Sequence, residues 1–276
     1  MRRSARLNLL RSAFSNWWVA GYLGSFAYRF SGVSPSLTRR LMNIRLRLRT
    51  RDGQVLVARL RDVNGPAEVF GAAEYAHEAI AWSDMSFILD AGAHVGGFTL
   101  WAAGRSPGSH IVSLEPNPEV RELLELNVRR QNLSGRVVIL PFALAAGHGR
   151  RAIRRTEDSA ASTLAADAAA GDVIVDTIGL ADAIKATGFP RLDLLKIDIE
   201  GAEYETLAAS SPDLLAGVAC CIVECHPRPP ESSASVGAFL RRCGLAVTTV
   251  SKPMGLELVV GTRAPVPAAP VTKLGR

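Results

Sequence analysis

The stretch that decides the fold is FILDAGAHVGGFTLWAA, which runs from Phe87 to Ala103. A short apolar run ends in Asp90, three glycines follow within a few residues, and apolar residues then return at helical spacing. This order predicts a buried strand, a glycine turn and a helix. In an open parallel sheet the ligand crevice lies beyond the carboxyl ends of the strands, where the strand order reverses. We therefore predict that the turn after Asp90 faces a ligand.

Strand and helix patterns alternate along the rest of the chain. Strands are predicted at 110–114, 136–140, 172–178, 192–199, 218–224, 246–250 and 256–260, and helices at 95–103, 118–130, 180–187, from 202 and at 235–242. Residues 141–171 are predicted to be irregular. Apolar strands that alternate with helices indicate an α/β fold with a doubly wound, mostly parallel sheet.

The segment before this sheet reads differently. Alternating arginines and apolar residues on both sides of Asp52 and Gly53 predict a β-hairpin over 43–60. A helix is predicted at 71–82, before the strand that ends in Asp90. We divide the chain into a basic N-terminal extension with an amphipathic helix and the hairpin (1–70), a main domain (71–261) and a loose Pro/Ala-rich tail (262–276).

Basic residues gather at the start of the chain. Residues 1–61 hold 13 of the 32 lysines and arginines and one of the 26 acids, while the net charge is +6. Such a segment can meet anionic lipid, nucleic acid or an acidic partner, but no nucleic-acid-binding module is present, and we predict no nucleic-acid partner. The apolar stretch 14–30 is too short to span a bilayer, so it either packs on this chain or a second subunit, or lies on a membrane surface.

The four cysteines, Cys220, Cys221, Cys225 and Cys243, form no Cys-x-x-Cys pair. With no secretory signal pattern, they predict reduced thiols and a cytoplasmic protein, with peripheral membrane contact left open. Adjacent cysteines on one strand point to opposite faces, so a zinc site is not predicted.

Two acids at predicted strand ends suggest the ligand. Asp90, Gly92 and Gly96 lack the Gly-x-Gly-x-x-Gly spacing of a pyrophosphate-binding turn. The glycines let a ligand approach the main chain, and the charge of Asp90 suits a cationic group. Glu115 ends the next strand and can accept both hydroxyls of a ribose. A ribose with a cationic end and no pyrophosphate suggests S-adenosylmethionine. Alternatively, Asp90 bonds the backbone of the turn, and Glu115 only precedes Asn117 as a helix N-cap.

Four segments resemble one known family. ILDAGAHVGGFTLWAA (88–103), VSLEPNPEVRELLELNV (112–128), LLKIDIEGAEYETL (194–207) and CIVECH (221–226) are similar, in order and spacing, to the FkbM-type S-adenosylmethionine-dependent methyltransferases. The resemblance implies a Rossmann-like seven-stranded sheet whose last strand is antiparallel, and O-methylation of a hydroxyl on a small molecule or sugar. It assigns the cofactor to Asp90, Gly92, Gly96 and Glu115. Neighbouring positions complete the predicted cofactor site: Ala93, Phe98, Pro116, Asn117 and Ala143.

Predicted catalytic residues lie at two further strand ends. Strand alternation places Asp198 with Lys196 on one face, Glu200 in the following turn, and Glu224 with His226 on one face of the next strand. Asp198, Glu200, Glu224 and His226 are thus predicted to act as a general base or to hold a divalent cation, although no metal site is assigned. The alternatives are a buried ion pair of Lys196 with Asp198 or Glu224, and a loop histidine. Glu203 and Glu205 are predicted to face solvent.

Two other functions fit the same pattern. A nicotinamide-dependent oxidoreductase uses the same type of sheet, although the glycine spacing disfavours it. The second alternative is a binding module without catalytic activity that docks on a membrane through residues 1–30. The sequence does not indicate the methyl acceptor or the oligomeric state.

Overall fold

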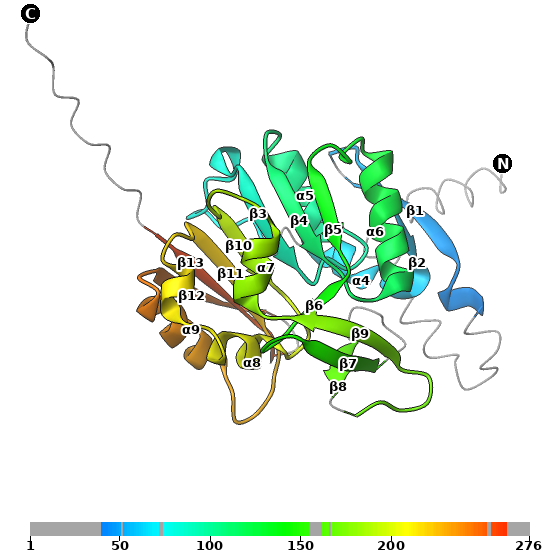
Figure 1. Ribbon diagram of the computed structural model, residues 1–276. Coiled ribbons are helices and arrows are strands. Elements are labelled where there is room, and N and C mark those ends of the chain that lie inside the picture. Colours follow the sequence, from blue (N-terminus) through cyan, green and yellow to red (C-terminus); the bar gives the residue numbers. More distant parts are fainter. Residues whose placement is uncertain are drawn as a thin grey trace, which may run out of the picture.

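The computed structural model describes residues 40–50, 52–71, 74–154, 162–165, 167–252 and 255–263 (Figure 1). The predicted N-terminal helix within 14–30 and nearly all of the predicted tail lie outside these residues. None of the helices described in these ranges has the length and hydropathy needed to cross a membrane.

The main sheet has seven strands in the order β12-β13-β11-β10-β3-β4-β5. Their bounds are β3 (Phe87–Ala91), β4 (His110–Leu114), β5 (Val137–Leu140), β10 (Leu194–Ile197), β11 (Cys220–Cys225), β12 (Ala246–Ser251) and β13 (Glu257–Thr262). The strands from β11 to β5 are parallel, and β13 runs antiparallel to both neighbours. This is the predicted Rossmann-like sheet. Its strand order reverses between β3 and β10, which is where a ligand crevice is expected.

Helices cover both faces of this sheet. They are α4 (Asn64–Gly71), α5 (Gly97–Arg105), α6 (Pro118–Arg130), α7 (Leu180–Ala186), α8 (Glu203–Ala208) and α9 (Ser233–Arg242), with the 3-10 turns η1 (Leu60–Asp62), η2 (Trp82–Asp84) and η4 (Pro212–Leu215). Ile88 belongs to the core under α5 and α6, whereas Leu89 belongs to the core under α7 to α9. Successive residues of a strand point to opposite faces, so the fully apolar strands fill two cores.

The predicted hairpin is present as β1 (Arg45–Arg49) and β2 (Val55–Arg59), which pair antiparallel. Leu48 and Leu56 are buried in the same core as α5 and α6. The buried side chain of Asn127 on α6 accepts from Val57 N at 2.7 Å and donates to Val57 O at 2.8 Å. This pair of hydrogen bonds fixes β2 against α6.

Two expectations about secondary structure are wrong. The helix predicted at 71–82 is not formed: α4 ends at Gly71, and the described residues that follow, 74–81, form turns. Tyr75 in this segment turns inward, and its ring lies edge-on to that of Phe98, with centroids 5.0 Å apart. The segment therefore forms turns that bury Tyr75 near the ends of the strands, and it does not form the amphipathic helix that the pattern predicted.

The stretch 141–171, predicted to be irregular, contains a second sheet. Its strands are β6 (Phe142–Leu144), β7 (Gly149–Arg154), β8 (Thr163–Ala165) and β9 (Val173–Ile178), in the order β6-β9-β7-β8. The strand predicted at 172–178 therefore belongs to this sheet and not to the main one. The small sheet has its own core around Ala143, Ile153 and Val175. It projects from one end of the main sheet (Figure 1).

Candidate functional site

A cleft lies at the carboxyl ends of β3, β4, β10 and β11. It encloses about 840 Å³, part of which is open to solvent, and α4 and the second sheet complete its wall. Eight predicted site residues line it: Gly92, Glu115, Pro116, Asn117, Ala143, Asp198, Glu200 and Glu224. Ala93 and Phe98 line a smaller cavity that shares Gly92 and Asp198 with the first. Asp90, Gly96 and His226 line neither cavity.

The glycines after β3 are required by the packing of the protein itself. Gly92 has φ +80°, and a Cβ there would lie 1.8 Å from the carbonyl oxygen of Asp198. Gly96 has φ +93°, and its Cβ would lie 2.7 Å from the side chain of Leu124. These positions need glycine because the loop after β10 and helix α6 come close. This packing alone accounts for both glycines, without the expected role of the turn in admitting a ligand.

Asp90 lies beneath the cleft. Its side chain is fully buried, with Oδ1 3.2 Å from Lys196 Nζ, and Oδ2 accepts from Thr99 Oγ1 at 2.6 Å. The ammonium of Lys196 thus lies beside Asp90, where the sequence led us to expect a cationic group. The two residues are neighbours in the parallel register of β3 and β10.

Glu115 combines the cleft wall with two backbone contacts. Its carboxylate is 7 % exposed and accepts from His94 N at 2.9 Å and Asn117 N at 2.8 Å. Burial raises its pKa to about 7, although the two backbone N–H groups oppose the shift. Asn117 also caps α6 by accepting from Glu119 N at 3.1 Å. The N-cap alternative is therefore present together with a carboxylate that faces the cleft.

Lys196 joins the two halves of the site. Its ammonium lies 3.2 Å from Asp90 and 3.3 Å from Asp198, and it donates to Gly92 O at 2.9 Å. Burial alone would lower the pKa of this ammonium, but the charges of Asp90 and Asp198 raise it above its ordinary value. Burial opposes the ionisation of Asp198 as well, but Lys196 and His226 keep its pKa below the ordinary value. The buried ion pair between Lys196 and Asp198, considered as an alternative above, is present.

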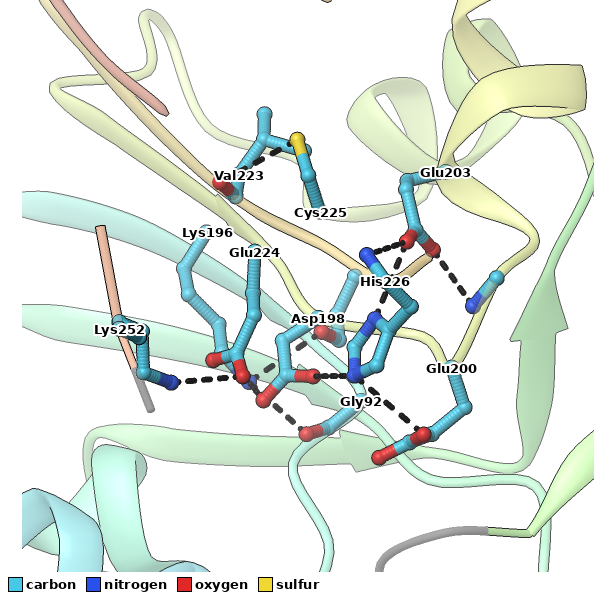
Figure 2. A network of polar contacts seen from close by, with 12 residues as sticks. Gly92, Lys196, Asp198, Glu200, Glu203, Val223, Glu224, Cys225, His226 and Lys252 are labelled. Carbon is cyan, nitrogen blue, oxygen red and sulfur yellow. Dashed lines mark hydrogen bonds and ion pairs between the residues drawn. The ribbon is translucent and has the colours of Figure 1, made fainter. Parts of the chain in front are cut away.

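His226 lies among carboxylates (Figure 2). Its Nδ1 is 3.0 Å from Glu203, and its Nε2 is 3.3 Å from Glu200 and 3.9 Å from Asp198. Burial opposes its charge, but hydrogen bonds with Glu200 and Glu203 raise its pKa to about 11. The imidazole is therefore protonated at neutral pH and holds the loops after β10 and β11 together.

The expectation that Glu203 and Glu205 face solvent is wrong. Glu203 is fully buried and accepts from Gly201 N and His226 N, both at 2.8 Å. Glu205 is half-buried and forms an ion pair with Arg151 of the second sheet. The helical pattern did not reveal that the first turn of α8 abuts two other elements.

Three residues of the site were missed in the sequence. The Tyr75 hydroxyl lies 3.2 Å from Glu224 Oε2 and 3.4 Å from Asp198 Oδ2, where its one proton is shared. Lys252, after β12, pairs with Glu224 at 2.7 Å and also with Glu74. Burial and the charge of Glu224 raise the pKa of Glu74 to about 8. No motif marks these residues, which reach the site from segments far apart in the chain.

Glu200 has the properties of a proton acceptor. It has a left-handed backbone with φ +55°, a conformation that costs free energy in residues other than glycine and is concentrated at functional sites. Burial raises its pKa to about 7, against the effect of His226 and together with the charges of Asp198 and Glu224. A carboxyl on the cleft wall with a pKa near neutrality suits general acid–base chemistry.

Asp198, Glu224 and His226 could also converge on a metal ion. Their ligand atoms lie within 4.8 Å of one another. However, Lys196 forms an ion pair with Asp198, and Lys252 forms one with Glu224. The negative charges of both carboxylates are thus already balanced by lysines of the protein. The donor set is therefore a poor fit for a divalent ion.

The cysteines are free and buried. Cys220 and Cys221 belong to opposite cores, as expected for neighbours in one strand. Burial raises the pKa of Cys220 to about 11 and that of Cys225 to about 12. Both thiols are therefore protonated at neutral pH.

The comparison that decides the family covers the site just described. Residues 90–245 match the model of the methyltransferase FkbM domain. The chain belongs to the FkbM methyltransferase family. The match begins at Asp90, the next-to-last residue of β3, and includes every predicted catalytic residue, so the family and the fold were predicted correctly.

Curated proteins with similar sequences include two methyltransferases. This FkbM chain is 27 % identical over 154 residues to Methyltransferase 1 of Beauveria bassiana, covering 48 % of this chain and 61 % of that protein. It is 26 % identical over 152 residues to Methyltransferase sdnD of Sordaria araneosa, covering 44 % of this chain and 59 % of that protein. It is 28 % identical over 228 residues to the AMB antimetabolite synthetase AmbE of Pseudomonas aeruginosa, covering 66 % of this chain and 10 % of that protein. The chain thus spans less than two thirds of each.

Among solved structures, a methyltransferase FkbM from Methylobacillus flagellatus is similar to this FkbM chain, with a TM-score of 0.48 and 15 % identity, over 65 % of this chain and 44 % of that one. An O-methyltransferase family protein from Burkholderia thailandensis is similar to it with a TM-score of 0.44 and 13 % identity, over 74 % of this chain and 60 % of that one.

Proposed function

We propose that this member of the FkbM family uses S-adenosylmethionine to methylate a hydroxyl group of a small molecule or sugar. The observation that carries the proposal is Glu115, a carboxylate at the end of β4 that faces the cleft beside the reversal of strand order. In doubly wound sheets an acid at this position binds the ribose of a nucleoside cofactor.

The residues around the cleft fit this cofactor. Each oxygen of Glu115 accepts one backbone N–H and keeps a lone pair for a ribose hydroxyl. The charged residues on the wall are five carboxylates, Glu68, Glu115, Asp198, Glu200 and Glu224, with no lysine or arginine among its described lining residues. Even with Asp198 and Glu224 paired to lysines behind them, such a wall suits a sulfonium cation better than phosphate groups. When bound, the cofactor supplies an electrophilic methyl group.

The residues after β10 and β11 would prepare the acceptor. Glu200 would accept the proton of the acceptor hydroxyl, whose oxygen would then be the nucleophile toward the methyl group that the cofactor supplies. Asp198 and Glu224 orient the acceptor through hydrogen bonds, since Lys196, Tyr75 and Lys252 hold both carboxylates in place. His226 already carries a proton and therefore positions Glu200 without acting as a base. Proximity of this kind contributes up to roughly 7 to 11 kcal/mol in the best-oriented reactions.

Titration calorimetry with S-adenosylhomocysteine tests the proposal. The unmodified chain should bind, and Glu115→Ala should weaken binding about tenfold or more, because a hydrogen bond to a charged group contributes roughly 1.5 kcal/mol or more. Glu125→Ala, on the outer side of α6, is the control and should leave the affinity unchanged. No binding at millimolar ligand by the folded protein would contradict the proposal.

The oxidoreductase alternative is separated from this proposal by thermal shift. A ligand that binds only the native state raises its melting temperature. We expect S-adenosylmethionine to raise it and NAD or NADP to leave it unchanged. The reverse result would favour the oxidoreductase.

A further inference from the structure

The outer face of β1 carries a row of arginines. Arg45, Arg47 and Arg49 are exposed, while Leu46 and Leu48 between them face the core. Among the described strands, β1 pairs only with β2, so no described strand covers its other edge. Strand alternation therefore gathers three cations on one face of an edge strand.

Most of these charges have no partner among the residues that the structure describes. Arg45 pairs with Glu122 at 2.9 Å, and both side chains are largely exposed. Arg47, Arg49 and the nearby Arg40 form no ion pair or side-chain hydrogen bond with any described residue. Arg40, Arg47 and Arg49 could thus bind an anionic surface without first breaking an ion pair with any described residue.

Two exposed apolar side chains directly precede β1 in the chain, with Ile44 on the side of Leu46 and not of the arginines. Leu41 is 40 % and Ile44 is 47 % exposed, and they are two of the five large apolar residues exposed in the described part of the chain. The sequence that leads into this edge contains Trp17, Trp18 and further arginines. Arginines with interspersed apolar residues are typical of surfaces that bind the interface of anionic membranes.

We propose that this arginine edge (Arg40, Leu41, Ile44, Arg45, Arg47 and Arg49) docks the protein on an anionic lipid bilayer. The arginines neutralise lipid headgroups, and Leu41 with Ile44 enters the headgroup region. A nucleic acid would use the charges but gain little from the two exposed aliphatic side chains. The docking surface is joined to one wall of the site, because β2 leads through η1 into α4, whose Gly65 and Glu68 line the cleft.

Sedimentation of the full chain with vesicles tests the inference. The probes are vesicles of phosphatidylcholine alone and of phosphatidylcholine with about one third phosphatidylglycerol. We expect binding only to the anionic vesicles, and we expect it to weaken at high salt, since exposed charges are screened within about 10 Å at 0.1 M salt.

Two triple variants decide whether the edge itself is responsible. Arg45→Ser, Arg47→Ser and Arg49→Ser together should weaken vesicle binding at least about tenfold, since each arginine near the surface contributes measurably. Arg130→Ser, Arg241→Ser and Arg242→Ser together remove the same charge elsewhere and should change binding less than about threefold. Both variants should keep the melting temperature and the affinity for S-adenosylhomocysteine, which separates docking from the proposed methyl transfer.

Several outcomes would overturn the inference. They are equal loss of binding in both triple variants, full binding by the edge variant, equal binding to both kinds of vesicle, and no vesicle binding with tight binding to a DNA duplex. Leu41→Ser with Ile44→Ser sharpens the test: it should weaken binding even at low salt, and unchanged binding would contradict the apolar part of the proposal.

Discussion

The two halves of the cleft are built differently. After β3 and β4, the protein shapes the wall mainly with backbone: Gly92 admits the carbonyl of Asp198, and two N–H groups orient Glu115. After β10 and β11, side chains hold one another, with Lys196, His226 and Lys252 set among carboxylates (Figure 2). Under the proposed function, the first half would hold the cofactor and the second would take the proton of the acceptor hydroxyl. Lys196 connects the halves, since it contacts Asp90, Gly92 and Asp198.

Removing this connection should have the largest effect. Lys196→Met leaves Asp90 and Asp198 as buried carboxylates without their cation, and such losses cost about 3–5 kcal/mol. Urea unfolding would measure the change. The exposed Lys185→Met is the control and should change the free energy of unfolding by less than about 0.5 kcal/mol. Similar small effects for both variants would mean that Lys196 does not join the halves.

The backbone half can be tested through glycine. Gly92→Ala places a Cβ 1.8 Å from the Asp198 carbonyl in a positive-φ position, and we expect a loss of about 3 kcal/mol in unfolding free energy. Gly53→Ala has a similar φ of +90° but nothing within 4 Å of its Cβ, so it should cost about 1 kcal/mol. Equal losses by urea unfolding would show that the close approach of the β10 loop is unimportant.

The side-chain half can be tested at Tyr75. Tyr75→Phe removes the hydroxyl shared by Asp198 and Glu224 and should cost about 1.5 kcal/mol of stability, because a hydrogen bond to a charged group is lost. The affinity for S-adenosylhomocysteine should stay within about twofold, since Tyr75 does not line the larger cavity. Calorimetry and urea unfolding measure both. A large loss of affinity with no loss of stability would place Tyr75 in the cofactor half.

A smaller effect should appear with pH. Because the free-protein pKa of Glu115 is raised to about 7, its carboxylate forms as the pH rises through 7. If only the ionised form binds the ribose well, affinity for S-adenosylhomocysteine should rise up to about tenfold from pH 6 to pH 8. In the absence of ligand, the raised pKa also means that Glu115 contributes less to the free energy of unfolding as the pH rises from the pKa of this group in the unfolded chain to about 7. Glu115→Gln should bind weakly without this pH dependence, and an unchanged slope would assign the titration to another group.

The sequence predicted the backbone half far better than the side-chain half. The turn after β3, the bounds of β4 and α6 and the cleft position of Glu115 follow from local patterns, because each depends on neighbouring residues. The ion pair of Asp90 with Lys196 was not predicted, because a sequence does not show the register that sets the two residues side by side. The parallel pairing of two distant strands decides that contact.

The same reason explains what was missed elsewhere in the site. The strand tips brought Asp198, Glu200, Glu224 and His226 together as predicted, since parallel strands end at one edge of the sheet. Glu203 was misplaced, and Tyr75 and Lys252 were missed, because their positions depend on how separate loops pack over that edge. The second sheet was missed because its strands are short and partly polar, so their period-2 pattern is weak.

A crystal structure of the complex with S-adenosylhomocysteine tests the division of the cleft most directly. The account predicts the ribose hydroxyls on the carboxylate of Glu115, the ligand against the turn at Gly92, and Asp198, Glu200 and Glu224 left free to meet an acceptor. A ligand bound among the carboxylates after β11, with Glu115 out of contact, would contradict it.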